Sequence, residues 1–181
     1  VGLIYQGQSG SPYSLVYSGD INGDNGTSND LIFIPTDAQV DQMQFLGTDA
    51  YTAEQQRANL KQWLATTRYV KDHRGEYFER YGDNLPFESH FDFHFGQKFG
   101  IRTGKYVHAL ELTLDIMNVA NLLNKDWGRT FSSGYNSEFI SPITYKGDGV
   151  FQFANPSDMP LKYPSSYYSR WRGQVGLKYT F

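Results

Sequence analysis

The chain has 181 residues, and its 16 Lys and Arg against 19 Asp and Glu give a formal net charge of −3 at pH 7. This near balance argues against a protein that binds nucleic acid through a basic face. The chain has no cysteine, which excludes disulfide bonds, cysteine-bound zinc and thiol catalysis. No apolar stretch approaches the roughly 20 residues of a membrane-spanning helix. Its 14 Tyr, 13 Phe and 18 Gly favour β-structure.

Four segments alternate apolar and polar residues with a period of two, which predicts strands with two different faces. The first covers about residues 1–17 and is split between residues 6 and 13; the others cover about 89–99, 106–118 and 170–181. A short turn at Ile101–Lys105 is expected to join the second and third strands. Long segments, 18–88 and 119–169, connect the others. No repeat or linker appears, so a single domain is expected.

The two faces of these strands differ in chemistry. The apolar face collects Phe91, Phe93, Phe95, Leu110, Leu112, Leu114, Val175 and Leu177. The opposite face collects Glu111, Asp115, Arg172 and Lys178. Aromatic residues flank the apolar stretches, and about 9–11 residues suffice for a tilted strand to cross a bilayer. We therefore expect an all-β fold, the last strands of an antiparallel transmembrane barrel, with the apolar face toward lipid and the charged face toward a wet lumen. The alternative is a soluble β-sandwich with one solvated face.

The long connecting segments contain local signals of their own. Thr52 followed by Gln55 forms a capping-box pattern, and an apolar stripe extends a helix to about Thr66. Residues 143–145 and 150–153 surround Lys146-Gly-Asp-Gly149 and predict a short hairpin. The segments are therefore expected to be long loops that include one short helix.

An acidic run resembles a calcium-binding loop. Its candidate ligands are Asp20, Asn22, Asp24 and Asp30, whose oxygens could converge on one hard cation. The run departs from the EF-hand pattern, because Asn25 stands at the glycine position and Leu31 at the position of the bidentate Glu. The alternative is an Asx-rich turn in which these side chains cap backbone amides.

Two further groups of side chains could bind ligands. His90, Asp92 and His94 share one strand face and could hold zinc. The favoured interpretation is that they form part of a polar lumen wall. Aromatic side chains of the segment 119–169 could stack on a sugar or peptide, or pack the segment together. They include Tyr135, Tyr163, Tyr167 and Tyr168. The chain contains no nucleophile elbow and no phosphate-binding glycine loop, so we do not expect an enzyme.

Several motifs together resemble the C-terminal end of a TonB-dependent outer-membrane receptor of the Bacteroidetes SusC-like and Oar-like kind. The matching segments are 7–14, 19–24, Asn29–Pro35, Arg74–Arg80, 114–124, Trp127-Gly128 and 174–181. Their order and spacing cover essentially the whole chain. The resemblance implies a segment of a 22-stranded barrel, with residues 101–105 in the periplasm and the segments 18–88 and 119–169 outside a Gram-negative cell.

The resemblance also implies a function and partners. Such receptors transport large solutes across the outer membrane with energy delivered through TonB. The expected partners are outer-membrane lipid, the rest of the barrel and its plug, TonB through an N-terminal region, and a surface lipoprotein; nucleic acid is not expected. We expect the chain to be the C-terminal part of a longer protein. The alternatives are a soluble calcium- or glycan-binding β-module and an outer-membrane adhesion protein.

Overall fold

The computed structural model describes residues 1–132, 138–153, 163–165 and 167–181. Strands predominate over a few short helices, so the all-β expectation is confirmed. The chain divides into two compact units. The first comprises Val1–Gly10, Pro86–Phe131 and Pro164–Phe181, and the second Ser11–Leu85 and Ser132–Tyr163. Each unit has its own sheet, and the single domain expected from the sequence stays a prediction.

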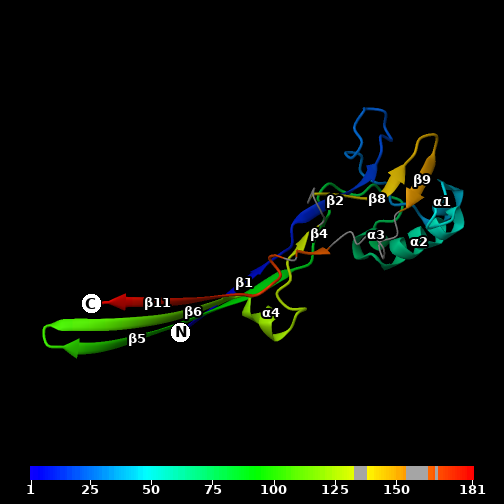
Figure 1. Ribbon diagram of the computed structural model, residues 1–181. Helices are drawn as coiled ribbons and strands as arrows, with labels where there is room; N and C mark the ends of the chain where they lie inside the picture. Colours follow the sequence, from blue (N-terminus) through cyan, green and yellow to red (C-terminus); the bar gives the residue numbers. More distant parts are fainter. Residues whose placement is uncertain (133–137, 154–162, 166) are drawn as a thin grey trace. The chain divides into compact units, whose positions relative to one another are not determined.

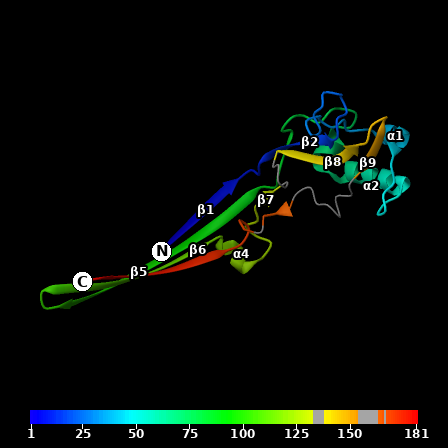
Figure 2. The ribbon, with the colours of Figure 1, turned by 45° about the horizontal axis from the view of Figure 1, so that its top comes forward.

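The first unit is built on a four-stranded antiparallel sheet in the order β1-β5-β6-β11. Its strands are β1 (Gly2–Gln8), β5 (Glu88–Thr103), β6 (Tyr106–Met117) and β11 (Arg172–Thr180). Figure 1 shows the β5–β6 hairpin with β11 alongside β6, and Figure 2 shows β1 along β5. The sheet is open, with β1 and β11 as its edges. The short helix α4 (Val119–Leu123) follows β6.

The turn between β5 and β6 is tighter than expected. Thr103 pairs with Tyr106, so only Gly104 and Lys105 lie between the strands. Gly104 has φ +62°, a backbone conformation that residues with a side chain rarely adopt. A glycine in the first of the two turn positions is therefore favourable in a two-residue hairpin. The residues from Ile101 to Thr103, expected in the turn, belong to β5.

The second unit contains a mixed five-stranded sheet in the order β3-β9-β8-β2-β4. Its strands are β2 (Pro12–Ser18), β3 (Gln44–Phe45), β4 (Asp83–Asn84), β8 (Phe139–Tyr145) and β9 (Val150–Phe153). Its helices are α1 (Asp37–Gln42), α2 (Ala53–Thr66) and α3 (Arg68–Asp72). Two-residue strands β7 (Phe131–Ser132) and β10 (Tyr163–Pro164) pair with each other.

Both local predictions for the connecting segments are confirmed. Helix α2 begins after Thr52, whose side-chain oxygen accepts a hydrogen bond from the Gln55 backbone N–H. The Thr52 backbone N–H in turn donates to the side-chain oxygen of Gln55. The β8–β9 hairpin turns at residues 146–149. The helices α1, α3 and α4 were not anticipated.

A buried glutamine attaches α2 to the sheet. The Gln56 side chain accepts a hydrogen bond from the Phe153 backbone at 2.9 Å and donates one to the Leu46 carbonyl at 2.8 Å. Trp63 packs against Phe153 with ring centroids 5.7 Å apart. The segments expected as loops therefore form a packed unit with its own core.

The prediction of one split strand across residues 1–17 is wrong. The β1 ladder ends at Gln8, and β2 pairs with β8 and β4 in the other sheet. Every residue from Tyr13 to Tyr17 is buried, so β2 is covered on both faces, whereas most of β1 is exposed. The alternation of Tyr13, Leu15 and Tyr17 continues that of β1, but alternation alone does not identify the sheet to which a strand belongs.

Candidate functional site

The strand register of the first unit places the predicted apolar residues on one face. Residues directly opposite in an antiparallel ladder point to the same side. Phe93 pairs with Ile116, Phe95 with Leu114, and Leu114 in turn with Val175. Leu112 pairs with Leu177, and in β1 Leu3 and Tyr5 pair with Phe93 and Phe91. The apolar face therefore continues across all four strands.

The same register places the charged residues together on the other face. Glu111 lies between Lys98 and Lys178, and Asp115 lies between His94 and Gln174. Asp115 Oδ1 is 2.5 Å from His94 Nδ1. This polar face is where the structure holds its candidate site.

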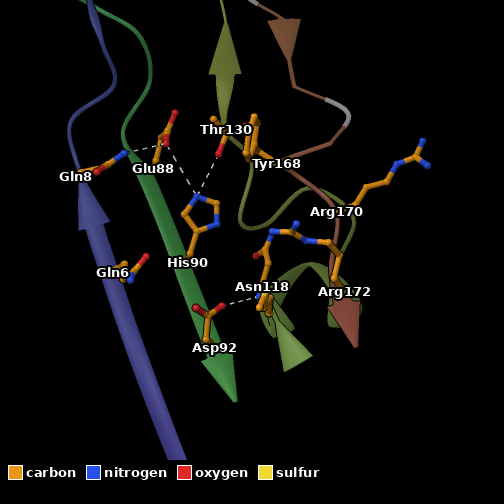
Figure 3. Close-up of a pocket in the computed structure, with 11 residues that line it drawn as sticks. Gln6, Gln8, Glu88, His90, Asp92, Asn118, Thr130, Tyr168, Arg170 and Arg172 are labelled. Atoms are coloured by element: carbon orange, nitrogen blue, oxygen red, sulfur yellow. Dashed lines mark hydrogen bonds and ion pairs between the residues drawn. The ribbon is translucent and has the colours of Figure 1, made fainter. Parts of the chain in front are cut away.

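The candidate site is a polar pocket of about 410 Å³ in the first unit, shown in Figure 3. Its lining side chains come from β1, the start of β5, the end of β6 and the residues around the start of β11. They are Gln6, Gln8, Glu88, His90, Asp92, Met117, Asn118, Thr130, Tyr168, Arg170 and Arg172. The pocket volume falls within the range of about 300–1,000 Å³ that small-molecule sites occupy.

One wall of the pocket is acidic but internally satisfied. The buried Glu88 accepts hydrogen bonds from Gln8 Nε2 at 3.3 Å and from the Phe131 backbone at 3.3 Å. His90 Nε2 lies 3.2 Å from Thr130 Oγ1 and 4.0 Å from Glu88 Oε2. These contacts, drawn in part as dashed lines in Figure 3, fix the orientation of the carboxylate and the imidazole.

Asn118 forms the floor between β6 and α4. It adopts left-handed backbone geometry with φ 54°, and its backbone N–H donates to Asp92 Oδ1 at 2.8 Å. Its side-chain amide donates to the carbonyls of Gly128 at 2.8 Å and Ser169 at 3.2 Å. This one residue therefore ties β5, the segment after α4 and the segment before β11 together around the pocket.

The opposite wall is basic and aromatic. Arg172 donates to Tyr167 Oη at 3.1 Å and lies over the Tyr167 ring at 5.0 Å from its centroid. In Figure 3 the Arg172 side chain points toward the side of the pocket that carries Asn118, whereas Arg170 points away from it. Neither arginine forms an ion pair with any residue that the structure describes. Tyr168 is 61% exposed.

The aromatic residues proposed as ligand contacts are only partly described. Tyr135 lies outside the described residues, and the side chain of Tyr163 lies outside them as well. Tyr167 and Tyr168 are both exposed and meet edge to face, with centroids 5.1 Å apart. Tyr168 lines the polar pocket and Tyr167 braces Arg172.

The structure brings together the four residues of the acidic loop through hydrogen bonds. The Asp20 carboxylate accepts from the backbones of Gly23, Asp24 and Asn25. Asn22 Nδ2 donates to Asp30 Oδ1 at 2.6 Å and to Asp24 Oδ2 at 3.2 Å.

The backbone N–H of Gly26 donates to the Asp24 carboxylate and, with the amides of Asn22 and Asn29, holds the pKa of that carboxyl below its ordinary value. This arrangement is the Asx-rich turn considered as the alternative. Binding of calcium by Asp20, Asn22, Asp24 and Asp30 stays a prediction.

His90, Asp92 and His94 share the polar face but have different partners. His90 contacts Thr130, Asp92 accepts from Asn118, and His94 pairs with Asp115. Within the described residues, no group of three or more His, Asp or Glu side chains is arranged to hold a metal ion. The polar-wall interpretation of these three residues therefore agrees with their surroundings.

Sequence reasoning placed His90, Asp92 and Arg172 on the polar face and Tyr168 among the ligand contacts, and the structure places all four at the pocket. In β1, Gln6 and Gln8 point to the same face as Ile4, which pairs with Asp92. The register would therefore have placed both glutamines on the polar face once β1 was paired with β5. Asn118 and Thr130 gave no signal, because a left-handed backbone and a loop contact are tertiary features.

No protein-family model, no curated protein and no solved structure matches the chain. Among the described residues, no helix is both long and apolar enough to cross a membrane.

Proposed function

We propose that the four-stranded sheet is part of the wall of an outer-membrane barrel, in a TonB-dependent receptor that transports a large solute. The observation that carries this proposal is the distribution of buried apolar side chains. Apart from Ala109, every buried hydrophobic residue among those described belongs to the second unit. Within the described residues of the first unit, no buried core packs against the apolar face of its sheet.

The exposure of that face supports lipid as its environment. Leu110, Leu112, Val175 and Leu177 are 40%, 37%, 70% and 70% exposed. Isolated apolar residues on a surface are ordinary, but a continuous face of this kind marks contact with a partner or a membrane. A soluble sandwich would need a second sheet packed over this face.

The dimensions of the strands also support a bilayer. β5, β6 and β11 contain 16, 12 and 9 residues, and about 9–11 residues span the hydrocarbon when tilted. At roughly 3.4 Å per residue, the 12 residues of β6 extend for about 41 Å, and at a tilt of about 40° they rise about 31 Å, enough to cross the roughly 25 Å apolar band of such barrels.

Aromatic side chains lie at both ends of this stretch. Near the hairpin end, Tyr179 stacks on Phe181 at 5.9 Å, and Tyr106 is 69% exposed. At the other end, Phe87 and Trp127 line a second pocket on the apolar side and are 62% and 55% exposed. Aromatic girdles at both interfaces are typical of membrane barrels.

The charged face suits a wet lumen. Lysine and glutamate side chains alternate across β5, β6 and β11 at Lys98, Glu111 and Lys178, and turning this face toward lipid would expose several charges together. TonB, the plug, a surface lipoprotein and the wider barrel rest on the family resemblance alone.

The test compares lysine at neighbouring positions of β11 that face opposite ways. Val175→Lys places a charge on the apolar face. Near mid-bilayer, this charge is expected to destabilise the protein folded in lipid vesicles by about 2–4 kcal/mol. Gln174→Lys, on the polar face, is the matched control and is expected to change the stability little. The measurement is urea-dependent folding of the full-length protein into vesicles.

Equal effects of the two lysines would contradict the membrane proposal. A protein that folds fully without lipid or detergent would favour the soluble β-module instead. Transport is tested separately by deleting the gene and comparing solute uptake with surface attachment. Normal uptake together with lost attachment would favour an adhesion protein.

A further inference from the structure

We propose that the polar pocket binds a carboxylate-bearing sugar unit of the transported solute. This inference rests on the proposed transport function for its biological setting. The binding itself depends only on the pocket of the first unit.

The basic wall of the pocket favours an anionic group on its β11 side. The two carboxylates stand on β5, where Glu88 accepts hydrogen bonds from Gln8 and the Phe131 backbone and Asp92 accepts one from Asn118. Arg172 contacts only the neutral Tyr167 among the described residues and retains N–H groups for a ligand. Since a guanidinium can meet a carboxylate with two parallel hydrogen bonds, Arg172 is the anchor that the pocket offers.

The rest of the lining favours a sugar over an apolar group. Met117 is the single aliphatic-chain apolar residue among the lining residues, so an apolar ligand would find little to contact. Gln6, Gln8 and the second oxygen of Asp92 offer donors and acceptors that hydroxyl groups can use. The exposed ring of Tyr168 offers a flat surface for a sugar ring.

The arrangement of the walls gives the ligand a direction. Tyr168 precedes β11 and Arg172 is its first residue, whereas Gln6 and Gln8 belong to β1. The two groups therefore lie on opposite sides of β5 and His90, as Figure 3 shows. The carboxylate would lie at Arg172, with the hydroxyl groups toward β1.

The experiment is calorimetric titration of the full-length protein in detergent micelles with trigalacturonate. Maltotriose is the neutral sugar probe and triglycine is the peptide carboxylate probe. We expect binding of trigalacturonate that weakens as NaCl is raised, because salt screens the charge interaction. Binding of maltotriose is expected to be at least about tenfold weaker, as loss of one charge-assisted contact implies.

Two variants and one control test the assignment of the walls. Arg172→Gln is expected to weaken trigalacturonate binding about tenfold or more. Gln6→Ala, on the opposite wall at an exposed position, is expected to weaken it by a smaller factor without disturbing the Arg172 contacts. Arg102→Gln is the control, because Arg102 lies on the polar face outside the pocket and has the same charge. It should leave binding unchanged.

Three outcomes would overturn the proposal. They are unchanged binding in both Arg172→Gln and Gln6→Ala, equal binding of maltotriose and trigalacturonate, and binding of triglycine in place of trigalacturonate. These results are independent of the lysine test on β11. If the titration fails while Val175→Lys and Gln174→Lys still differ, the cargo class is wrong and the membrane proposal stands. If the titration succeeds while the two lysines behave alike, the pocket belongs to a protein of another class.

Discussion

Asn118 and Gly128 depend on each other beside the polar pocket. Gly128 has φ +60°, and a methyl group added to it would overlap Asn118 Oδ1. That oxygen is buried and has no hydrogen-bond partner among the described residues, while the amide nitrogen of the same side chain holds the Gly128 and Ser169 carbonyls. Packing against a glycine therefore lets one side chain close the floor of the pocket.

We predict that Gly128→Ala destabilises the protein by more than its backbone geometry alone requires. The left-handed conformation costs roughly 1–2 kcal/mol for alanine, and displacing Asn118 would add about 1 kcal/mol for each hydrogen bond lost. Gly104→Ala is the control, because Gly104 has φ +62° and nothing within 4 Å of an added Cβ. Urea unfolding of the two variants measures the difference; equal losses would show that the Asn118 contact contributes nothing.

At the same scale, the residues of the site could be predicted from the sequence only where a strand pattern placed them. Arg172, His90 and Asp92 follow the polar parity of their strands, and the structure places all three at the pocket. Glu88 and Asn118 depend on backbone contacts from residues 131 and 128, which no local pattern contains. Tertiary hydrogen bonds, rather than residue type, place Glu88 and Asn118 at the pocket.

The bounds of helix α2 are determined by local sequence signals. Its capping box and its buried stripe of Leu60, Trp63 and Leu64 are both local, and the helix runs from Ala53 to Thr66 as expected. β2 is the opposite case, because its place between β8 and β4 depends on partners more than 60 residues away in the sequence. Local signals predicted the first element and could not predict the second.

We predict that Thr52→Ala destabilises the second unit by about 1 kcal/mol, the usual cost of an N-cap. The loss follows from the hydrogen bond that Thr52 accepts from the Gln55 backbone. Thr67→Ala is the matched control, since Thr67 occupies the N-cap of α3 without a side-chain capping bond. Thermal unfolding followed by circular dichroism measures both variants. The capping interpretation is wrong if Thr67→Ala costs as much as Thr52→Ala.

For the whole molecule, the two units differ in what keeps them folded. The second has buried residues such as Leu15, Ile32, Leu60 and Ile143, which stabilise it through contacts within the protein. Within its described residues the first has long ladders but almost no apolar core, and under the membrane proposal lipid or detergent covers its apolar face. The periodic faces of β5, β6 and β11 predicted this sheet from the sequence. In the second unit α2 and the β8–β9 hairpin were predicted, but the assembly of its sheet could not be, because its strands are short and most of its pairings are long-range.

We predict that hydrogen exchange separates the units when detergent is removed from the full-length protein. Amides of β5, β6 and β11 are expected to lose protection, whereas those of β2, β8 and α2 keep it, because local protection follows local burial. The control is the same protein with detergent restored, in which both sets should again be protected. Parallel loss in the two units would contradict the assignment of lipid to the apolar face.

The open edges of the four-stranded sheet have a consequence for self-association. The outer side of β1 offers backbone N–H and C=O groups that no described strand pairs with, and its sequence GLIYQGQ contains neither a charged residue nor a proline. Soluble sheets use such residues to prevent edge-to-edge pairing. In water, two copies of this chain would therefore pair edge to edge through β1, with the paired strands about 4.8 Å apart. Under the barrel proposal, β1 must therefore pair with its neighbouring barrel strand before it meets another copy.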